Sequence, residues 1–83
     1  MASQIFRSGT SIGANIREAQ NAESKRDFIH KFKISAKEAD ELEYWLMLCR
    51  DSIFYPNPPE SILTELRSII KVISKIISTS KKS

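Results

Sequence analysis

The stretch of residues 57–83 carries the pattern that most restricts what this chain can fold into. Large apolar residues recur in it every three or four positions, so on a helix they share one broad arc of the surface. These residues are Ile62, Leu63, Leu66, Ile69, Ile70, Ile73, Ile76 and Ile77. The pattern predicts a helix with a wide buried face, which the rest of the chain must cover.

Signals for the start of this helix precede its apolar positions. Asn57 is suited to be the N-cap, Pro58 fits the first helical position, and Glu60 completes an N-x-x-E capping pattern. We therefore expect the helix to span residues 58–79.

The net charge of +3 lies in the same part of the chain. Residues 1–24 contain two basic and two acidic residues, and residues 25–57 contain six of each. Residues 58–83 contain five basic and only two acidic residues, and so hold the whole excess. The five are Arg67, Lys71, Lys75, Lys81 and Lys82. Most of them recur at helical spacing, which predicts a basic stripe opposite the apolar arc.

Composition predicts one helical domain over residues 1–83, because 41% of the residues are hydrophobic and only two are Gly. A domain this small buries only roughly 60% of its unfolded surface, so it would gain stability from a partner. The single Cys49 cannot form an internal disulfide. We see neither a signal peptide nor a membrane span, and we expect a cytoplasmic protein.

A first helix is predicted at residues 3–22, where Ser3 is a candidate N-cap. Gly9 and Gly13 lie four positions apart in it, and each weakens a helix by roughly 0.5 to 1 kcal/mol relative to Ala. That cost indicates that another backbone approaches this face closely. The alternative is that both are tolerated irregularities near a fraying end.

A second helix is predicted at residues 25–51, where Ser24 and Asp27 form an S-x-x-D cap. A Pro-rich turn follows, and we expect its Phe54 and Tyr55 to fold back onto the end of the bundle.

The second helix also carries apolar residues outside its core arc, namely Ile34, Trp45 and Cys49. A lone three-helix bundle would leave such a strip exposed, and Trp is enriched at the centres of interfaces. We therefore predict that these three residues form a subunit interface. The alternative is that Trp45 covers the edge of its own core.

Three polar residues fall in or beside the apolar faces: Asn15, Glu18 and Glu43. A buried carboxylate needs a donor, so we expect a buried polar network in which Glu43 meets Asn15, Arg17 or another chain. His30 lies on a polar face without a second His or Cys at ligand spacing. No motif for a nucleophile, a phosphate loop or a metal stands out, so we predict a non-catalytic protein without cofactor or metal.

Residues 7–46 resemble a four-helix-bundle family encoded by intervening sequences in bacterial 23S ribosomal RNA genes. Three motifs carry the resemblance: SIGANIREA at residues 11–19, DFIHK at 27–31 and KEADELEYWL at 37–46. The resemblance implies an all-α, up-and-down antiparallel bundle, with three long helices in this chain. It also implies a homopentamer with a role in binding nucleic acid, like a similar accessory protein of diversity-generating reverse transcriptases.

Positions that match the family motifs are implied to order the bundle and its subunit contacts. They are Asn15, Glu18, Lys37, Glu38, Glu41 and Trp45. The resemblance also implies a further helix before the segment that starts here near Ser3. We expect either a truncated form or a helix from another subunit in its place.

The leading hypothesis is a non-catalytic homo-oligomer that binds RNA or DNA without sequence preference. In this hypothesis the phosphates are bound by the five basic residues of the third helix and its tail, namely Arg67, Lys71, Lys75, Lys81 and Lys82. Secondary candidates are Arg7, Arg17, Lys25 and Arg26. The alternatives are a structural module that docks an RNA-processing or reverse-transcription protein, a basic amphipathic helix on a membrane surface, and a basic face that only keeps the protein soluble.

Overall fold

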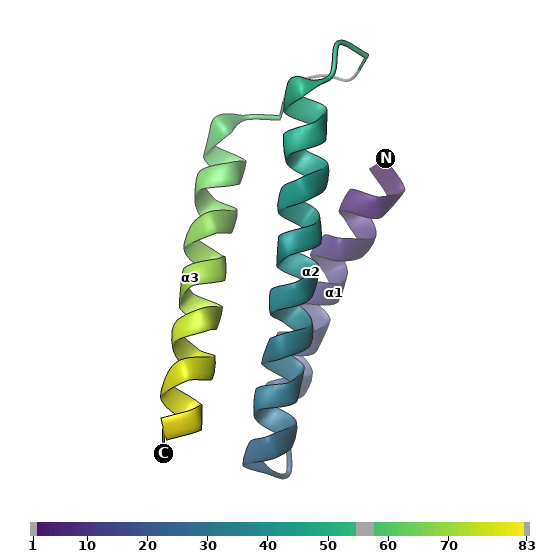
Figure 1. Cartoon of the computed structure of the whole chain (residues 1–83). Helices are drawn as coiled ribbons and strands as arrows, with labels where there is room; N and C mark the ends of the chain where they lie inside the picture. Colours follow the sequence, from purple (N-terminus) through teal and green to yellow (C-terminus); the bar gives the residue numbers. More distant parts are fainter. Residues whose placement is uncertain (1, 55–57, 83) are drawn as a thin grey trace.

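The structure is a computed structural model that describes residues 2–54 and 58–82. These residues form three helices, α1 (Ala2–Gln20), α2 (Lys25–Asp51) and α3 (Glu60–Lys82), without any strand among them. The chain reverses direction at each connection, so α1 and α3 run the same way and α2 runs against both (Figure 1). The predicted all-α helical bundle is confirmed.

The bounds of α2 agree with the prediction because its signals are local. The Oγ atom of Ser24 accepts a hydrogen bond from the backbone N–H of Asp27 at 3.0 Å, as the cap pattern requires. Helix α1 ends at Gln20, earlier than predicted, where the N–H groups of Asn21 and Ala22 turn back to carbonyls three residues earlier.

Helix α3 begins at Glu60 rather than at the expected Pro58. Pro58 is followed by Pro59, and a residue before proline is sterically pushed away from helical geometry. The first turn instead starts with a 3.1 Å hydrogen bond from the N–H of Ile62 to the carbonyl of Pro59. The predicted N-cap, Asn57, lies outside the described residues.

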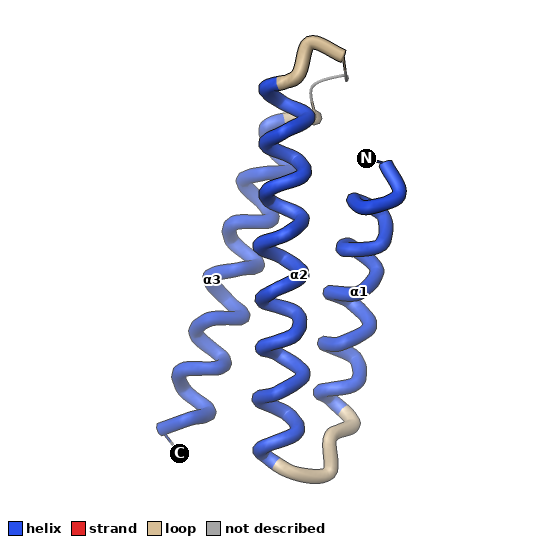
Figure 2. The backbone as a smooth tube through the Cα atoms, turned by 45° about the vertical axis from the view of Figure 1, so that its right-hand side comes forward, coloured by secondary structure: helices blue, strands red, loops and turns tan. Residues whose placement is uncertain are grey.

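Helix α2 is central and packs against both of the others (Figure 2). Two clusters of buried side chains join the three helices. The first contains Ile12, Ala39, Leu46, Leu63 and Leu66, and the second contains Ala19, Phe32 and Ile73. Each helix therefore contributes buried side chains to both clusters, and together the clusters form one core along α2.

Small residues bring α1 and α2 together. Ser8, Ser35 and Ala39 are each 0% exposed, and the hydroxyl of Ser35 donates to the carbonyl of Ile12 at 3.1 Å. The close approach predicted at Gly9 and Gly13 is wrong within this chain, because a Cβ atom at either position would meet nothing within 4 Å. The close contact lies instead on the face of α1 that contains the fully buried Ser8.

The bundle is open on the side opposite α2. Among the described residues, no Cα atom of α1 lies within 8 Å of one of α3. The radius of gyration is 14.0 Å, larger than the roughly 12 Å of a compact chain of this length, because the bundle is elongated, with extents of 46 × 21 × 14 Å. Helices α1 and α3 pack on different sides of α2 and meet only through side chains in the core.

This opening corrects the prediction of a wide buried face on α3. Leu63, Leu66 and Ile73 are buried, but Ile62 and Ile69 are 41% and 43% exposed. Val72, beyond the predicted arc, is 57% exposed. These side chains lie on a flank of α3 that no described helix covers.

The strip predicted on α2 is largely covered within the chain. Cys49 is buried, because it lies two heptads after Ser35 and so shares the face that packs on α1. The expectation that one copy would leave Cys49 exposed is therefore wrong. Ile34 and Trp45 are half-buried, and the Trp45 ring makes an edge contact with Tyr44, with centroids 5.3 Å apart.

Two smaller findings complete the fold. Phe54 is 86% exposed, so the prediction that it folds back onto the bundle is wrong, and Tyr55 lies outside the described residues.

No described helix is long and apolar enough to cross a membrane.

The core position with the largest fully buried side chain is Ile73, which is 1% exposed. We expect Ile73→Ala to lower the free energy of unfolding by about 2–5 kcal/mol, because it removes apolar contacts and leaves a cavity. Chemical denaturation followed by circular dichroism measures the change. Ile53→Ala, at a position 91% exposed, is the matched control and should stay within about 0.5 kcal/mol of the parent. Equal effects of both variants would contradict this core.

Candidate nucleic-acid interface

Ion pairs divide the basic residues into neutralised and available groups. Arg67 pairs with Glu43, with 2.9 Å between Nε and Oε2. Lys31 pairs with Glu18 at 3.2 Å, and Arg50 pairs with its neighbour Asp51. Arg67 was a leading candidate for phosphate contacts, and the structure instead joins it to α2.

The predicted buried polar network is not formed. Glu43 meets Arg67 of α3 and neither Asn15 nor Arg17, because its side chain lies on the α3 side of α2. The Nδ2 group of Asn15 donates to the carbonyl of Ser11 within α1 at 2.9 Å. Glu18 is exposed and binds Lys31. Asn15, Glu18 and Glu43 therefore each contact a different partner residue and do not form one network.

Available basic residues gather where α2 begins and α3 ends, at the lower end of the molecule in Figure 1. We call this cluster the basic end. It consists of Lys25, Arg26 and Lys33 from α2 with Lys81 and Lys82 from α3. No ion pair to Lys25, Lys33 or Lys81 is found within residues 2–54 and 58–82.

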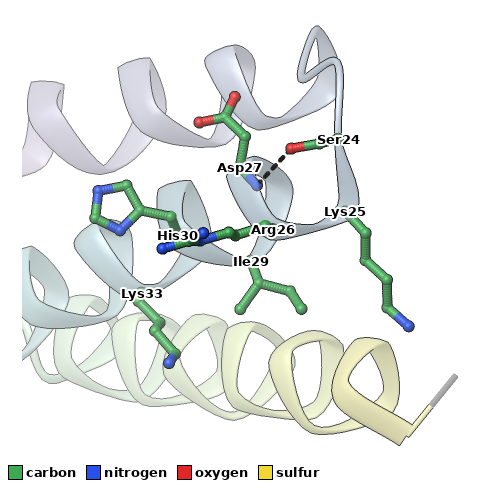
Figure 3. A pocket seen from close by; sticks show the side chains of 7 residues that line it. All are labelled: Ser24, Lys25, Arg26, Asp27, Ile29, His30 and Lys33. Carbon is green, nitrogen blue, oxygen red and sulfur yellow. Dashed lines mark hydrogen bonds between the residues drawn. The ribbon is translucent and has the colours of Figure 1, made fainter.

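A shallow pocket marks the α2 half of the basic end. It is lined by Ser24, Lys25, Arg26, Asp27, Ile29, His30 and Lys33. Figure 3 shows the Lys25 and Lys33 side chains on the side toward α3, whereas the Asp27 carboxylate points to the opposite side. His30 is exposed beside them, as predicted for a surface residue. The nearest carboxylate of α2 thus does not lie between the cations.

Two lysines from different helices meet at the basic end. Lys33 of α2 lies close to Lys81 of α3, and the neighbouring Lys81 side chain and its positive charge disfavour the charged form of Lys33, which lowers the pKa of Lys33. The Lys33 side chain remains fully exposed to solvent. The two positive groups therefore lie near each other, and neither has an ion pair among the described residues.

The remaining candidates are not brought into one site. Lys71 and Lys75 are exposed on α3. Arg7 and Arg17 are exposed near opposite ends of α1, about 15 Å apart along its axis. Arg7 borders a second shallow pocket of α2, whose lining includes Lys33 of the basic end together with Lys37 and acidic residues.

Sequence reasoning missed Lys33. Its segment carries equal numbers of basic and acidic residues, which hides a local excess. The available signal was the length of the two helices, because antiparallel neighbours of 27 and 23 residues place the start of one beside the end of the other.

The chemistry offered by this arrangement is electrostatic. Exposed ammonium and guanidinium groups bind anions, and the N-terminus of α2 adds a favourable partial positive charge. Within the described part of the chain, no group of three or more His, Cys, Asp or Glu residues is placed to hold a metal ion.

The lowered pKa of Lys33 gives a direct test of the basic end. The folded-state pKa lies below the unfolded one, so the repulsion opposes folding at neutral pH, and this penalty is lost as the pH rises from the lowered folded-state pKa of Lys33 to its ordinary value. Lys81→Gln should raise the pKa of Lys33 toward its ordinary value, as read from an NMR titration of the lysine side chains. Lys75→Gln is the control. A Lys33 titration that Lys81→Gln leaves unchanged would contradict the contact.

Comparison with known proteins assigns the chain to a family. The family model described as 23S rRNA-intervening sequence protein matches residues 1–79. A search of curated proteins finds no match. A crystal structure from Bacteroides thetaiotaomicron, described as a protein of unknown function from the S23 ribosomal protein family, superposes with a TM-score of 0.86 at 50% identity. The match covers 93% of this chain and 72% of that one. The chain belongs to the 23S rRNA-intervening sequence protein family.

Proposed function

We propose that this protein is a non-catalytic nucleic-acid-binding protein that holds phosphate groups at its basic end. The observation that carries the proposal is the gathering of exposed basic side chains where the start of α2 lies beside the end of α3. Lys33 and Lys81 repel each other there, and a phosphate oxygen placed between them replaces that repulsion with two charge-assisted hydrogen bonds. Lys25, Arg26 and Lys82 extend the positive surface for neighbouring phosphates along a strand.

The basic end favours binding without sequence preference. Base recognition on single strands uses exposed aromatic side chains as stacking platforms. In the described part of the chain, the highly exposed aromatic residues are Phe6, Tyr44 and Phe54. Phe6 lies in the first half of α1, Tyr44 in the last part of α2, and Phe54 just after α2, all toward the end of the bundle opposite the start of α2. Contacts to the backbone therefore dominate at the basic end, and such contacts carry no sequence information.

RNA is the first ligand to test. The family description refers to intervening sequences of 23S rRNA, and the basic end offers the point charges that phosphates bind. Self-association, including the homopentamer that the resemblance implies, multiplies the net charge of +3 and strengthens binding through several linked contacts.

The test measures binding of a fluorescent single-stranded RNA by anisotropy at several salt concentrations. We expect affinity to fall linearly with salt on logarithmic axes. The double variant Lys33→Gln with Lys81→Gln should bind more weakly, and its slope should shrink by about 1.4, because each lost contact on a single strand is worth about 0.7.

The double variant Arg50→Gln with Lys71→Gln removes the same charge outside the basic end and is the matched control. It should retain the slope and most of the affinity. Binding that ignores salt, or equal losses in both double variants, would overturn the proposal and favour a protein-docking module. Co-sedimentation with anionic vesicles, without RNA binding, would instead favour the membrane alternative.

A further inference from the structure

An exposed face of α2 carries the second shallow pocket, which continues from the basic end. Lys33 belongs to the lining of both pockets, so the two surfaces meet at this side chain. The lining of the second pocket also includes Lys37, Asp40 and Tyr44. These four residues follow one another at intervals of three or four positions, so they share one face of the helix. The basic end and Tyr44 are therefore two parts of one surface on α2.

Tyr44 presents an aromatic ring on this face. It is 58% exposed, and the ring of Trp45 meets it edge-on, with centroids 5.3 Å apart. This contact restrains the orientation of the Tyr44 ring, and a tyrosine has only two side-chain torsions to fix. A restrained and exposed ring beside basic residues is the kind of platform on which proteins stack the bases of single strands.

The sign of the charges changes along the pocket. Lys33 and Lys37 lie on the side of the basic end, whereas Asp40 and Glu41 come next to Tyr44. Neither of these two carboxylates has an ion pair within residues 2–54 and 58–82. A carboxylate repels a phosphate but accepts hydrogen bonds from the donor groups of a sugar or a base. The Tyr44 side of the pocket therefore suits the uncharged part of a nucleotide.

We propose that the second pocket binds a base of a single-stranded nucleic acid, stacked on Tyr44, while the basic end holds phosphates of the same strand. This inference rests on the proposed function and adds a base contact to it. Lys33 and Tyr44 are 11 positions apart, so about 16 Å separate them along the helix axis. A stacked strand rises about 3.4 Å per nucleotide, so about five nucleotides join the two parts. Every base has an aromatic face, so the contact favours single strands without choosing among the bases.

The first experiment compares two fluorescent probes of about ten nucleotides, twice the joining length. One is oligouridylate, and the other is its abasic counterpart, which keeps the riboses and phosphates but lacks the bases. Anisotropy at constant salt should show that the parent chain binds oligouridylate about 5- to 100-fold more tightly, which is the effect of one stacked base. This comparison uses the unaltered protein, so it does not depend on how a variant folds.

The second experiment locates the base contact with variants. Tyr44→Ala should lose most of the preference for oligouridylate and bind the abasic probe as the parent does, whereas Tyr44→Phe should keep the preference because it retains a ring. Phe54→Ala removes an aromatic ring 86% exposed that is not part of the pocket lining. It is the matched control and should keep the preference. Lys33→Gln with Lys81→Gln should weaken the binding of both probes, since both carry phosphates.

The outcomes separate this inference from the function on which it rests. Equal affinity of the parent for both probes would overturn the base contact and leave phosphate binding at the basic end in place. The same holds for a preference that Tyr44→Ala leaves intact, and for a Tyr44→Ala variant that binds both probes more weakly by the same factor. A lack of salt-dependent binding to either probe would instead overturn the proposed function, and the base contact with it.

Discussion

The contact on which the rest of this structure depends is the tight seam between α1 and α2. Ser8, Ser35 and Ala39 have no exposed surface, so the two backbones approach closely and little room remains between them. The seam has a cost. Among the described residues, Ser8 Oγ and Glu38 Oε2 are buried without a hydrogen-bond partner, and such groups each cost about 1–3 kcal/mol. The apolar contacts of the neighbouring core must offset it.

This seam decides where α3 can lie. With α1 on one face of α2, the remaining apolar face of α2 accepts α3, and the Arg67–Glu43 pair borders that contact. α1 and α3 then meet only through side chains in the core. The same placement sets the start of α2 beside the end of α3. The basic end is therefore a consequence of helix packing, since its two halves are far apart in sequence.

Local features of this chain could be predicted from sequence, and relations between helices could not. The cap at Ser24 defined α2 because it involves only Asp27, three residues later. Periodicity located the apolar residues of α3, yet it does not say which part of an apolar arc a neighbour covers. Ile69 and Ile73 look equivalent in sequence, but their exposures are 43% and 1%. Only the position of the other helices distinguishes them.

Charge illustrates the same difficulty at the candidate site. Arg67 and Lys81 are both basic residues of α3, but Arg67 has an acidic partner and Lys81 faces another lysine. Counting charges by segment treats them alike and misses Lys33 altogether. Partners three or four positions away are visible in a helical sequence, whereas partners about 24 or 48 positions away depend on the packing of α2 against α3.

The two surfaces that the fold leaves available run in different directions. The apolar strip of α3 extends along the bundle, and the basic end lies across its tip. The strip consists of Ile62, Ile69 and Val72, and none of these residues belongs to the basic end. Burial of the strip therefore leaves the tip of the bundle uncovered, and the basic end can bind a polyanion while the strip is buried. The two surfaces also respond to different forces, because apolar burial depends little on salt whereas phosphate binding weakens steeply as salt rises.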